Sequence, residues 1–277
     1  MEQKITKEAA VGVDIGSLTA KSVVVDRDRR IVSYHVVQGT IVDEQAAVAS
    51  LDRALRDAGL EKEQIGFLVT TGYGRTMVDF GDKNITEISC HARGANFLMP
   101  DARTVIDIGG QDSKVIAMDP SGKVANFSMN DKCAAGTGRF IEVMAHALDV
   151  PLDRMGSLSL TSDDPAAISS MCTVFAESEV ISLSAKGRSK PDIIAGIHEA
   201  IGRRMKSLAN HVGLAAPVLM SGGVAKNAGV VRVLERLLGT PIAVPEEPQI
   251  VGALGAALYA LDEIEKERVK ERRHNDE

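Results

Sequence analysis

The stretch VGVDIGSLTAKSVVVD (11–26) recurs as TVIDIGGQDSKVIAMD (104–119). Each copy reads as an apolar strand, a turn at glycine and a second apolar strand, which is the signature of a β-hairpin. A further strand-like run follows each copy, at 30–37 and at 123–129. The repeat therefore predicts two domains, each beginning with a three-stranded antiparallel meander. Shifted by 93 residues, the copies share five residues in register: Asp14/Asp107, Ile15/Ile108, Gly16/Gly109, Lys21/Lys114 and Asp26/Asp119.

After each meander the pattern changes to helices and short buried strands, which predicts a mixed α/β fold. We expect a boundary near Pro100, with one domain formed by 1–100 plus 251–277 and the other by 101–250. The segment 153–170 has no clear periodicity and is predicted to be a surface loop. The charged segment 263–277 reads as a solvated helix end or a frayed tail. Helices are predicted at 43–58, 85–98, 139–148, 174–185, 192–212, 229–238 and from about Val251, and buried strands at 66–71 and 217–222.

Composition excludes several classes of protein. The net charge of −6 argues against a nucleic-acid-binding surface. No apolar run approaches membrane-spanning length, and the N-terminal residues lack an apolar signal core. We therefore expect a cytoplasmic protein without nucleic-acid or membrane partners, in which the three cysteines stay reduced.

The two hairpins carry the residues expected to bind phosphate. A glycine turn without Cβ bulk lets backbone N–H groups approach phosphate oxygens. An aspartate at the end of the first strand, Asp14 or Asp107, is suited to hold hydrated Mg²⁺, and we expect both aspartates to face solvent. One such hairpin is a weak signal, but two copies in separate halves predict a triphosphate clamped from both sides.

A third glycine turn lies in LMSGGVAKN (219–227), where a buried strand is followed by Gly222, Gly223 and a helix. This arrangement suits the sugar or phosphate of a nucleotide, although an ordinary strand-to-helix loop has the same pattern. The later run GALGAA (252–257) is interpreted as close packing and a hinge, because small residues let backbones approach.

Two cysteines, Cys133 and Cys172, each precede a predicted helix, where free N–H groups and the helix dipole stabilise a thiolate or an anionic cluster. They lack the CxxC spacing of a zinc ribbon. Two such ligands are half of what a 4Fe-4S cluster needs, and a two-fold dimer would supply four. The residues alone fit two buried thiols as well.

The order of these motifs resembles the superfamily of actin, sugar kinases and heat-shock ATPases. DIGS resembles its first phosphate motif, DIGGQD its second, LMSGGVA its adenosine motif and GALGAA its second connecting helix. The resemblance implies two ribonuclease-H-like domains with a nucleotide cleft between them. ITEISCHARGANFL (85–98) resembles the first connecting segment, which places Glu87 near the attacking water, although a helix N-terminal charge explains this glutamate equally well.

The strings TGYGR (71–75), IDIGGQD (106–112), NDKCAAGTGRF (130–140) and CTVFAESEVIS (172–182) closely resemble the ATP-dependent activators of 2-hydroxyacyl-CoA dehydratases. They also resemble the ATPase subunits of benzoyl-CoA reductase and the reductases of double-cubane-cluster proteins. The resemblance implies a homodimer bridged by one 4Fe-4S cluster on Cys133 and Cys172, while Cys90 matches no cluster position and is expected to be a buried thiol. It also implies ATP-driven electron transfer to an iron-sulfur partner enzyme, with ferredoxin or flavodoxin as the upstream donor.

These interpretations define the expected site. The catalytic residues are expected to be Asp14, Glu87, Asp107 and Gln111. The residues expected to contact ATP or ADP with Mg²⁺ are Gly16, Ser17, Lys21, Gly109, Gly110, Gly136, Gly138, Gly222 and Gly223. The cluster ligands are expected to be Cys133 and Cys172.

Two other functions fit parts of this pattern. A small-molecule kinase of the same superfamily, such as an N-acetylhexosamine kinase, would need a sugar-binding insertion and an acceptor base. A non-catalytic actin-like or chaperone-like module would need a polymerisation surface or a peptide-binding domain, for which 277 residues leave no room. Neither alternative gives the cysteines a role.

Overall fold

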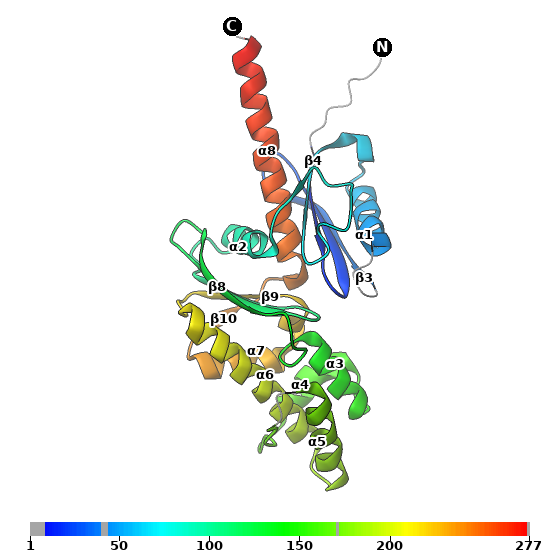
Figure 1. The fold of residues 1–277 in the computed structure, drawn as a ribbon, viewed down its shortest axis with the longest axis vertical. Helices are drawn as coiled ribbons and strands as arrows, with labels where there is room; N and C mark the ends of the chain where they lie inside the picture. Colours follow the sequence, from blue (N-terminus) through cyan, green and yellow to red (C-terminus); the bar gives the residue numbers. More distant parts are fainter. Residues whose placement is uncertain (1–8, 40–43, 170–171, 276–277) are drawn as a thin grey trace. The chain divides into compact units, whose positions relative to one another are not determined.

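The computed structural model describes residues 9–39, 44–169 and 172–275 (Figure 1). The chain forms two compact units. Unit 1 consists of Met1–Pro100 together with Gln249–Glu277, and unit 2 of Asp101–Pro248. Each unit contains one five-stranded sheet.

The sheet of unit 1 has the strand order β3-β2-β1-β4-β5. The first three strands form the predicted antiparallel meander, and β4 and β5 continue it in parallel. Every residue of β1 is buried, whereas all residues of β3 are half-buried or exposed, as expected for a central and an outer strand. The bounds are β1 Ala9–Ile15, β2 Thr19–Val25, β3 Ile31–Gln38, β4 Ile65–Thr71 and β5 Lys83–Asn84.

Helices cover both faces of this sheet. Helix α1 (Glu44–Asp57) packs its apolar side on one face, and α8 (Val251–Asn275) packs on the other beside α2 (Glu87–Leu98) (Figure 1). A Cβ on residue 12 would lie 2.0 Å from the carbonyl oxygen of Ala253, so only glycine lets β1 and α8 approach this closely. The predicted packing role of the run 252–257 is confirmed.

The sheet of unit 2 has the order β10-β9-β6-β7-β8, which repeats the topology of unit 1. Strands β6, β7 and β8 form the second meander, and β9 and β10 run parallel to β6. The correspondence pairs β1 with β6 and β4 with β9. The bounds are β6 Thr104–Ile108, β7 Ser113–Met118, β8 Val124–Asn130, β9 Val218–Ser221 and β10 Ile242–Ala243.

The helices of unit 2 enclose a single apolar core. Its largest fully buried side chains include Phe140, Met155, Ile197 and Met205. Helix α6 starts at a cap in which Ser189 Oγ accepts a hydrogen bond from the Asp192 amide. The bounds are α3 Gly138–Ala147, α4 Met155–Ser159, α5 Thr173–Ala185, α6 Lys190–Val212 and α7 Ala228–Leu238, with 3₁₀ turns η1 Lys62–Gln64, η2 Leu152–Arg154, η3 Gly223–Lys226 and η4 Pro248–Ile250.

The surface loop predicted for 153–170 is wrong for much of that segment. It contains the end of η2 and all of α4, and Met155, Ala166 and Ile168 are buried in the core. A five-residue helix is too short to show a 3.6-residue period, which explains why the sequence pattern gave no signal. Residue 170 lies outside the described part of the chain.

The segment 263–275 is the end of α8, in agreement with the solvated helix end that the sequence predicted. None of the helices within 9–39, 44–169 and 172–275 is both long and apolar enough to cross a bilayer.

Candidate functional site

The first hairpin brings Asp14 and Lys21 together. They are cross-strand partners on β1 and β2, and Lys21 Nζ lies 3.2 Å from Asp14 Oδ2. The turn closes through a hydrogen bond from the Gly16 amide to the Thr19 carbonyl oxygen, at 3.0 Å. A Cβ on residue 16 would lie 2.9 Å from Lys21 Nζ, so glycine lets the ammonium group lie against the turn.

The Asp14 carboxylate fits between two glycines. A Cβ on residue 72 would lie 2.3 Å from Oδ1, and one on residue 252 would lie 3.1 Å from Oδ2. The same position above Gly252 lies 2.9 Å from His91 Nε2, so His91 and Asp14 converge on the first turn of α8. Side chains at either glycine would displace the carboxylate.

The second hairpin repeats this pair with more partners. Lys114 Nζ lies 3.0 Å from Asp107 Oδ2 and 2.8 Å from Asp112 Oδ2. Ser221 Oγ donates a hydrogen bond of 2.8 Å to Asp107 Oδ1. The ammonium group of Lys114 therefore lies between two carboxylates, whereas the ammonium group of Lys21 pairs with Asp14.

Both aspartates are buried, with relative exposures of 5% for Asp14 and 3% for Asp107. This corrects the expectation that they face solvent. A buried carboxylate is stable in its ionised form only with a cation or hydrogen-bond donors beside it. In each hairpin the lysine on the facing strand, Lys21 or Lys114, supplies the positive charge beside the aspartate. Both lysines belong to the sequence repeat.

The equivalence of the units extends to glycine turns that follow β4 and β9. Thr71 pairs in register with Asp14, and Ser221 with Asp107. The next residues, Gly72 and Gly222, have φ values of +87° and +85°, a conformation that favours glycine. In both turns a Cβ would meet the carbonyl group of the isoleucine of the DIG motif and a carboxylate oxygen of its aspartate.

Helix α2 places Glu87 in its first turn, after the N-cap Thr86. Glu87, Cys90 and His91 are all buried. Burial raises the pKa of the Cys90 thiol to about 12, and the charges of Asp14 and Glu87 also raise it. The carboxylates of Asp14 and Glu87 thus act on one buried point, and Cys90 is the buried thiol that the sequence predicted.

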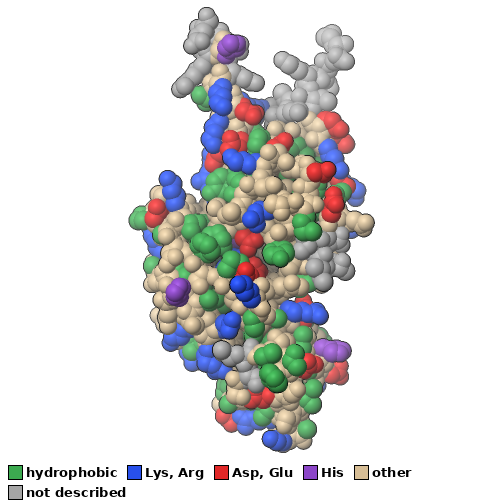
Figure 2. All heavy atoms as spheres, viewed as in Figure 1, with side chains coloured by type: hydrophobic (Ala, Val, Ile, Leu, Met, Phe, Trp, Pro, Cys, Tyr) green, Lys and Arg blue, Asp and Glu red, His purple; other side chains and the backbone are tan. Residues whose placement is uncertain are grey.

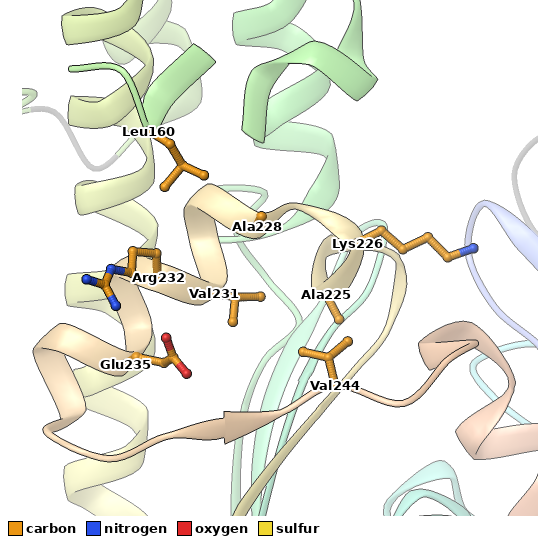
Figure 3. A pocket seen from close by; sticks show the side chains of 8 residues that line it. All are labelled: Leu160, Ala225, Lys226, Ala228, Val231, Arg232, Glu235 and Val244. Carbon is orange, nitrogen blue, oxygen red and sulfur yellow. The ribbon is translucent and has the colours of Figure 1, made fainter. Parts of the chain in front are cut away.

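Hydrogen bonds hold the third glycine turn at its start and at its end. The Gly222 amide donates to the Pro248 carbonyl oxygen at 2.9 Å, and Asn227 caps α7 by accepting a hydrogen bond from the Val230 amide. An open hollow of about 480 Å³ lies beside this turn (Figure 3). Its lining is mostly apolar and consists of Leu160, Ala225, Lys226, Ala228, Val231, Arg232, Glu235 and Val244.

The segment that carries Cys133 is hydrogen-bonded to the second hairpin. The Gly138 amide donates to the Gly109 carbonyl oxygen and the Arg139 amide to that of Gly110, both at 2.8 Å. Asn130 Nδ2 donates to the Cys133 carbonyl oxygen at 2.7 Å. The first amides of α3 therefore bind the second hairpin directly. Gly136 has φ +89° and packs against the side chain of Arg204.

Cys133 is half-buried, and Cys172, the N-cap residue of α5, is exposed. Helices α3 and α5 pack against each other. Helix α5 exposes Val174, Phe175 and Ile181 by 66%, 67% and 52%, and apolar side chains gather on this part of unit 2 (Figure 2). Among the described residues, no group of three or more His, Cys, Asp or Glu side chains could hold a metal ion within one chain.

The structure thus groups the expected residues by unit. Unit 1 holds Asp14, Gly16, Ser17, Lys21 and Glu87. Unit 2 holds Asp107, Gly109, Gly110, Gln111, Gly136, Gly138, Gly222, Gly223, Cys133 and Cys172, with Gln111 exposed at the tip of the hairpin turn. Sequence reasoning assigned no role to His91, Asp112 or Ser221. Both Asp112 and Ser221 lie in the quoted motifs. Asp112 pairs with Lys114 within the second hairpin, whereas the contact of Ser221 with Asp107 depends on the pairing of β9 with β6.

Residues 11–260 match the BadF/BadG/BcrA/BcrD ATPase family. The activator of lactoyl-CoA dehydratase of Anaerotignum propionicum is 51% identical over 257 residues, covering 92% of this chain and 98% of that protein. The solved activator of the 2-hydroxyisocaproyl-CoA dehydratase from Clostridium difficile, with bound ADPNP, superposes with a TM-score of 0.91 at 46% identity, covering 95% of this chain and 97% of that one.

Component A of the (R)-2-hydroxyglutaryl-CoA dehydratase of Acidaminococcus fermentans gives a TM-score of 0.89 at 47% identity, covering 93% of this chain and 99% of that one. The predicted α/β class of the actin-like ATPases is confirmed by these neighbours and by the two five-stranded sheets. With similarity over nearly its whole length to activators of 2-hydroxyacyl-CoA dehydratases, this chain belongs to the BadF/BadG/BcrA/BcrD ATPase family.

Proposed function

We propose that this protein is an ATP-driven electron donor. It hydrolyses MgATP and passes single low-potential electrons to an iron-sulfur enzyme of the 2-hydroxyacyl-CoA dehydratase, benzoyl-CoA reductase or double-cubane type. The names of its relatives support the partner class. The observation that carries the proposal is the pair of hydrogen bonds joining the second phosphate hairpin to the start of α3, because it connects a nucleotide motif to the segment of Cys133.

The nucleotide part of the proposal assigns roles to both units as ATPase domains I and II. Asp14 and Asp107 hold hydrated Mg²⁺, and the hairpin amides with Lys21 and Gln111 bind phosphate oxygens. Glu87 orients the attacking water, since Asp14 and Glu87 act on the same buried point. Hydrolysis needs positioning and charge neutralisation more than a covalent intermediate.

The cysteines fit half of a 4Fe-4S site. Cys133 and Cys172 are accessible, each precedes a helix of unit 2, and those helices pack together. Because a cluster of this type takes four thiolates, the full site requires both cysteines of two chains. When bound, the cluster supplies one-electron redox chemistry at low potential.

A homodimer is the second requirement of this site. A two-fold axis brings the same patch of two chains together, so a single exposed apolar face suffices. Helix α5 offers such a face in Val174, Phe175 and Ile181, directly after Cys172. Exposed apolar patches of this kind mark interaction surfaces.

The hydrogen bonds between the second hairpin and α3 would couple nucleotide binding to the environment of Cys133. Phosphate binding or release moves the turn of the second hairpin, and the Gly138 and Arg139 amides transmit that movement to α3. The environment of Cys133 then changes with the nucleotide, which alters exposure and hydrogen bonding, two determinants of reduction potential. ATP in place of ADP is the signal that permits transfer to the partner.

The test uses protein purified without oxygen and then reduced, for instance with ferredoxin or flavodoxin. Electron transfer to the partner enzyme is followed by stopped-flow absorbance with MgATP, with MgADP and without nucleotide. We expect transfer with MgATP only. Equal rates in all three conditions would contradict the coupling.

The cluster assignment has its own readout. We expect a brown protein with iron and sulfide near four per dimer. Cys133→Ser and Cys172→Ser should each abolish the chromophore, since each removes two of four ligands, while Cys90→Ser should keep it. A colourless protein with active sugar phosphorylation would instead favour the kinase alternative.

A further inference from the structure

We propose that Arg75 binds the phosphate chain of the nucleotide held at the Asp14 hairpin. This inference rests on the proposed nucleotide site and adds a binding residue to it. It concerns the turn TGYGR (71–75), which follows β4 in unit 1.

The turn is attached directly to the first phosphate hairpin. The Gly74 amide donates a hydrogen bond of 2.9 Å to the carbonyl oxygen of Ile15, the residue after Asp14. Gly72 lies against the same carbonyl group and against Asp14 Oδ1, too closely for any Cβ. Residues of this turn therefore keep a fixed position beside the Asp14 carboxylate.

Both the backbone and the side chain of Arg75 form hydrogen bonds within this segment. Thr70 Oγ1 donates to the Arg75 carbonyl oxygen at 3.2 Å, and Arg75 Nη1 donates to the Gly72 carbonyl oxygen at 3.0 Å. Arg75 is half-buried. A guanidinium group has five N–H donors in a planar fork, so one bond to Gly72 leaves donors available to an oxyanion.

The charge of Arg75 reaches the same buried point as the carboxylates. The guanidinium lowers the pKa of Cys90, whereas the charges of Asp14 and Glu87 raise it, so all three charged groups influence the same buried thiol. Lys21 pairs with Asp14, and Arg75 adds a second cation to the region that holds the carboxylates of Asp14 and Glu87. Mg²⁺ and a phosphate chain add charge of both signs there, which both cations and carboxylates complement.

The second unit provides an internal comparison. Gly72 and Gly222 occupy equivalent positions after equivalent strands, so Arg75 corresponds to Ala225. The conformation of the glycine is thus achieved without an arginine in unit 2, where residues 223–226 form a 3₁₀ turn. The cation in unit 1 is available for binding.

The experiment compares Arg75→Gln with Arg75→Lys. Glutamine keeps an N–H donor for the Gly72 carbonyl oxygen but has no charge, whereas lysine keeps the charge and loses the fork. The dissociation constant of MgADPNP is measured by calorimetry on the oxygen-free dimer, and the melting temperature without nucleotide checks the fold. Arg56→Gln, an exposed arginine in the last turn of α1, is the control for the change in net charge.

We expect Arg75→Gln to weaken MgADPNP binding by about 10- to 100-fold, as for loss of a hydrogen bond to a charged group, and Arg75→Lys to weaken it less. Arg56→Gln should change it by less than about twofold. Binding by Arg75→Gln at the wild-type level, or equal loss in the Lys and Gln variants, overturns the proposal. Failure of the wild-type protein to bind MgADPNP would instead refute the nucleotide site itself.

Discussion

Ser221 Oγ donates a hydrogen bond of 2.8 Å to Asp107 Oδ1 across the parallel strands β9 and β6. Thr71 has the equivalent register position beside Asp14, but its buried hydroxyl has no hydrogen-bond partner in the described part of the chain. The two repeated aspartates therefore differ in how firmly they are held. Asp107 is oriented by a serine and a lysine that also binds Asp112, whereas Asp14 is oriented by Lys21 and by the close approach of two glycines.

This difference predicts unequal consequences for two matched variants. Asp14→Asn and Asp107→Asn should each lower MgATP turnover by about 100-fold or more, because each removes a charge from the Mg²⁺ site. Asp107→Asn should also destabilise the fold by about 1–3 kcal/mol, since buried Lys114 loses one of its two carboxylates. Phosphate release and urea unfolding measure the two effects. Normal turnover by Asp107→Asn would contradict the site.

Glu87→Gln separates positioning of water from binding of nucleotide. If Glu87 orients the attacking water, its amide variant should reduce kcat while the dissociation constant of MgADPNP stays within about threefold. Glu44→Gln is the control for the change in charge, because Glu44 is an exposed acid in the first turn of α1, whereas Glu87 is buried in the first turn of α2. Equal, small effects of both variants would assign Glu87 to the helix dipole alone.

The hairpins and their repeat could be predicted from the sequence because they depend on local alternation and on glycine turns. Asp14 and Lys21 face each other across a two-stranded pair, so a seven-residue spacing determined their contact. The contact of Asp107 with Ser221 could not be predicted this way, since 114 residues separate them and only sheet order joins them. The same holds for the turn that carries Arg75, because its Gly72 reaches the Asp14 carboxylate only through the pairing of β4 with β1.

Burial was predicted less well than secondary structure. The aspartates were expected to face solvent at the nucleotide site, but the lysine beside each of them offsets the free-energy cost of burying a carboxylate. Met155 and Ile168 were missed because isolated apolar residues in an irregular segment have no period. The burial of residues outside long regular elements can be predicted only when the positions of the surrounding helices are known.

Gly12→Ala should be strongly destabilising. Its Cβ would lie 2.0 Å from the Ala253 carbonyl oxygen and 2.3 Å from the Ala257 amide nitrogen, both in the backbone of α8. Relief requires β1 and α8 to separate, which we expect to cost about 3 kcal/mol or more. Gly59→Ala, with φ +67° and no atom within 4 Å of the new Cβ, should cost about 1 kcal/mol from backbone strain alone. Urea unfolding of both variants tests this difference.

The three cysteines should differ in reactivity in the protein without bound metal. Cys90 is fully buried, and burial raises the pKa of its thiol to about 12. Cys133 and Cys172 are accessible. Iodoacetamide at pH 8 should therefore alkylate Cys133 and Cys172 in the folded protein, while Cys90 reacts only after unfolding. Peptide mass spectrometry reads the sites, and rapid modification of Cys90 in folded protein would contradict its burial.

His198 predicts a specific dependence of stability on pH. It is fully buried on α6, and burial lowers the pKa of its imidazole to about 4 from the usual 6.5. Its Nε2 lies 3.2 Å from Asn227 Nδ2, a donor, because Asn227 Oδ1 accepts the Val230 amide. His198 Nε2 is therefore the acceptor and Nδ1 carries the proton, and Nδ1 has no hydrogen-bond partner in the described part of the chain.

The direction in which stability changes with pH follows from proton uptake by His198. Between pH 6.5 and 4 the unfolded chain binds a proton at His198 that the folded chain does not, so unfolding becomes easier as pH falls through this range. The stabilisation that the neutral His198 contributes to the folded state is fully present above pH 6.5. It declines toward pH 4 by at most about 3 kcal/mol, as expected for a pKa shift of this size. His198→Gln should flatten this part of the curve, while His211→Gln, at the exposed end of α6, should leave it unchanged.

Urea unfolding at half-unit pH steps measures the free energies, with near-ultraviolet absorbance or circular dichroism as the signal. Subtracting the His198→Gln curve from the wild-type curve removes the shared contribution of other titrating groups. The difference should be level above pH 6.5 and fall below it. A difference that does not change between pH 6.5 and 4 would mean that His198 titrates alike in the folded and unfolded chains, and that its burial next to Asn227 does not hold it neutral.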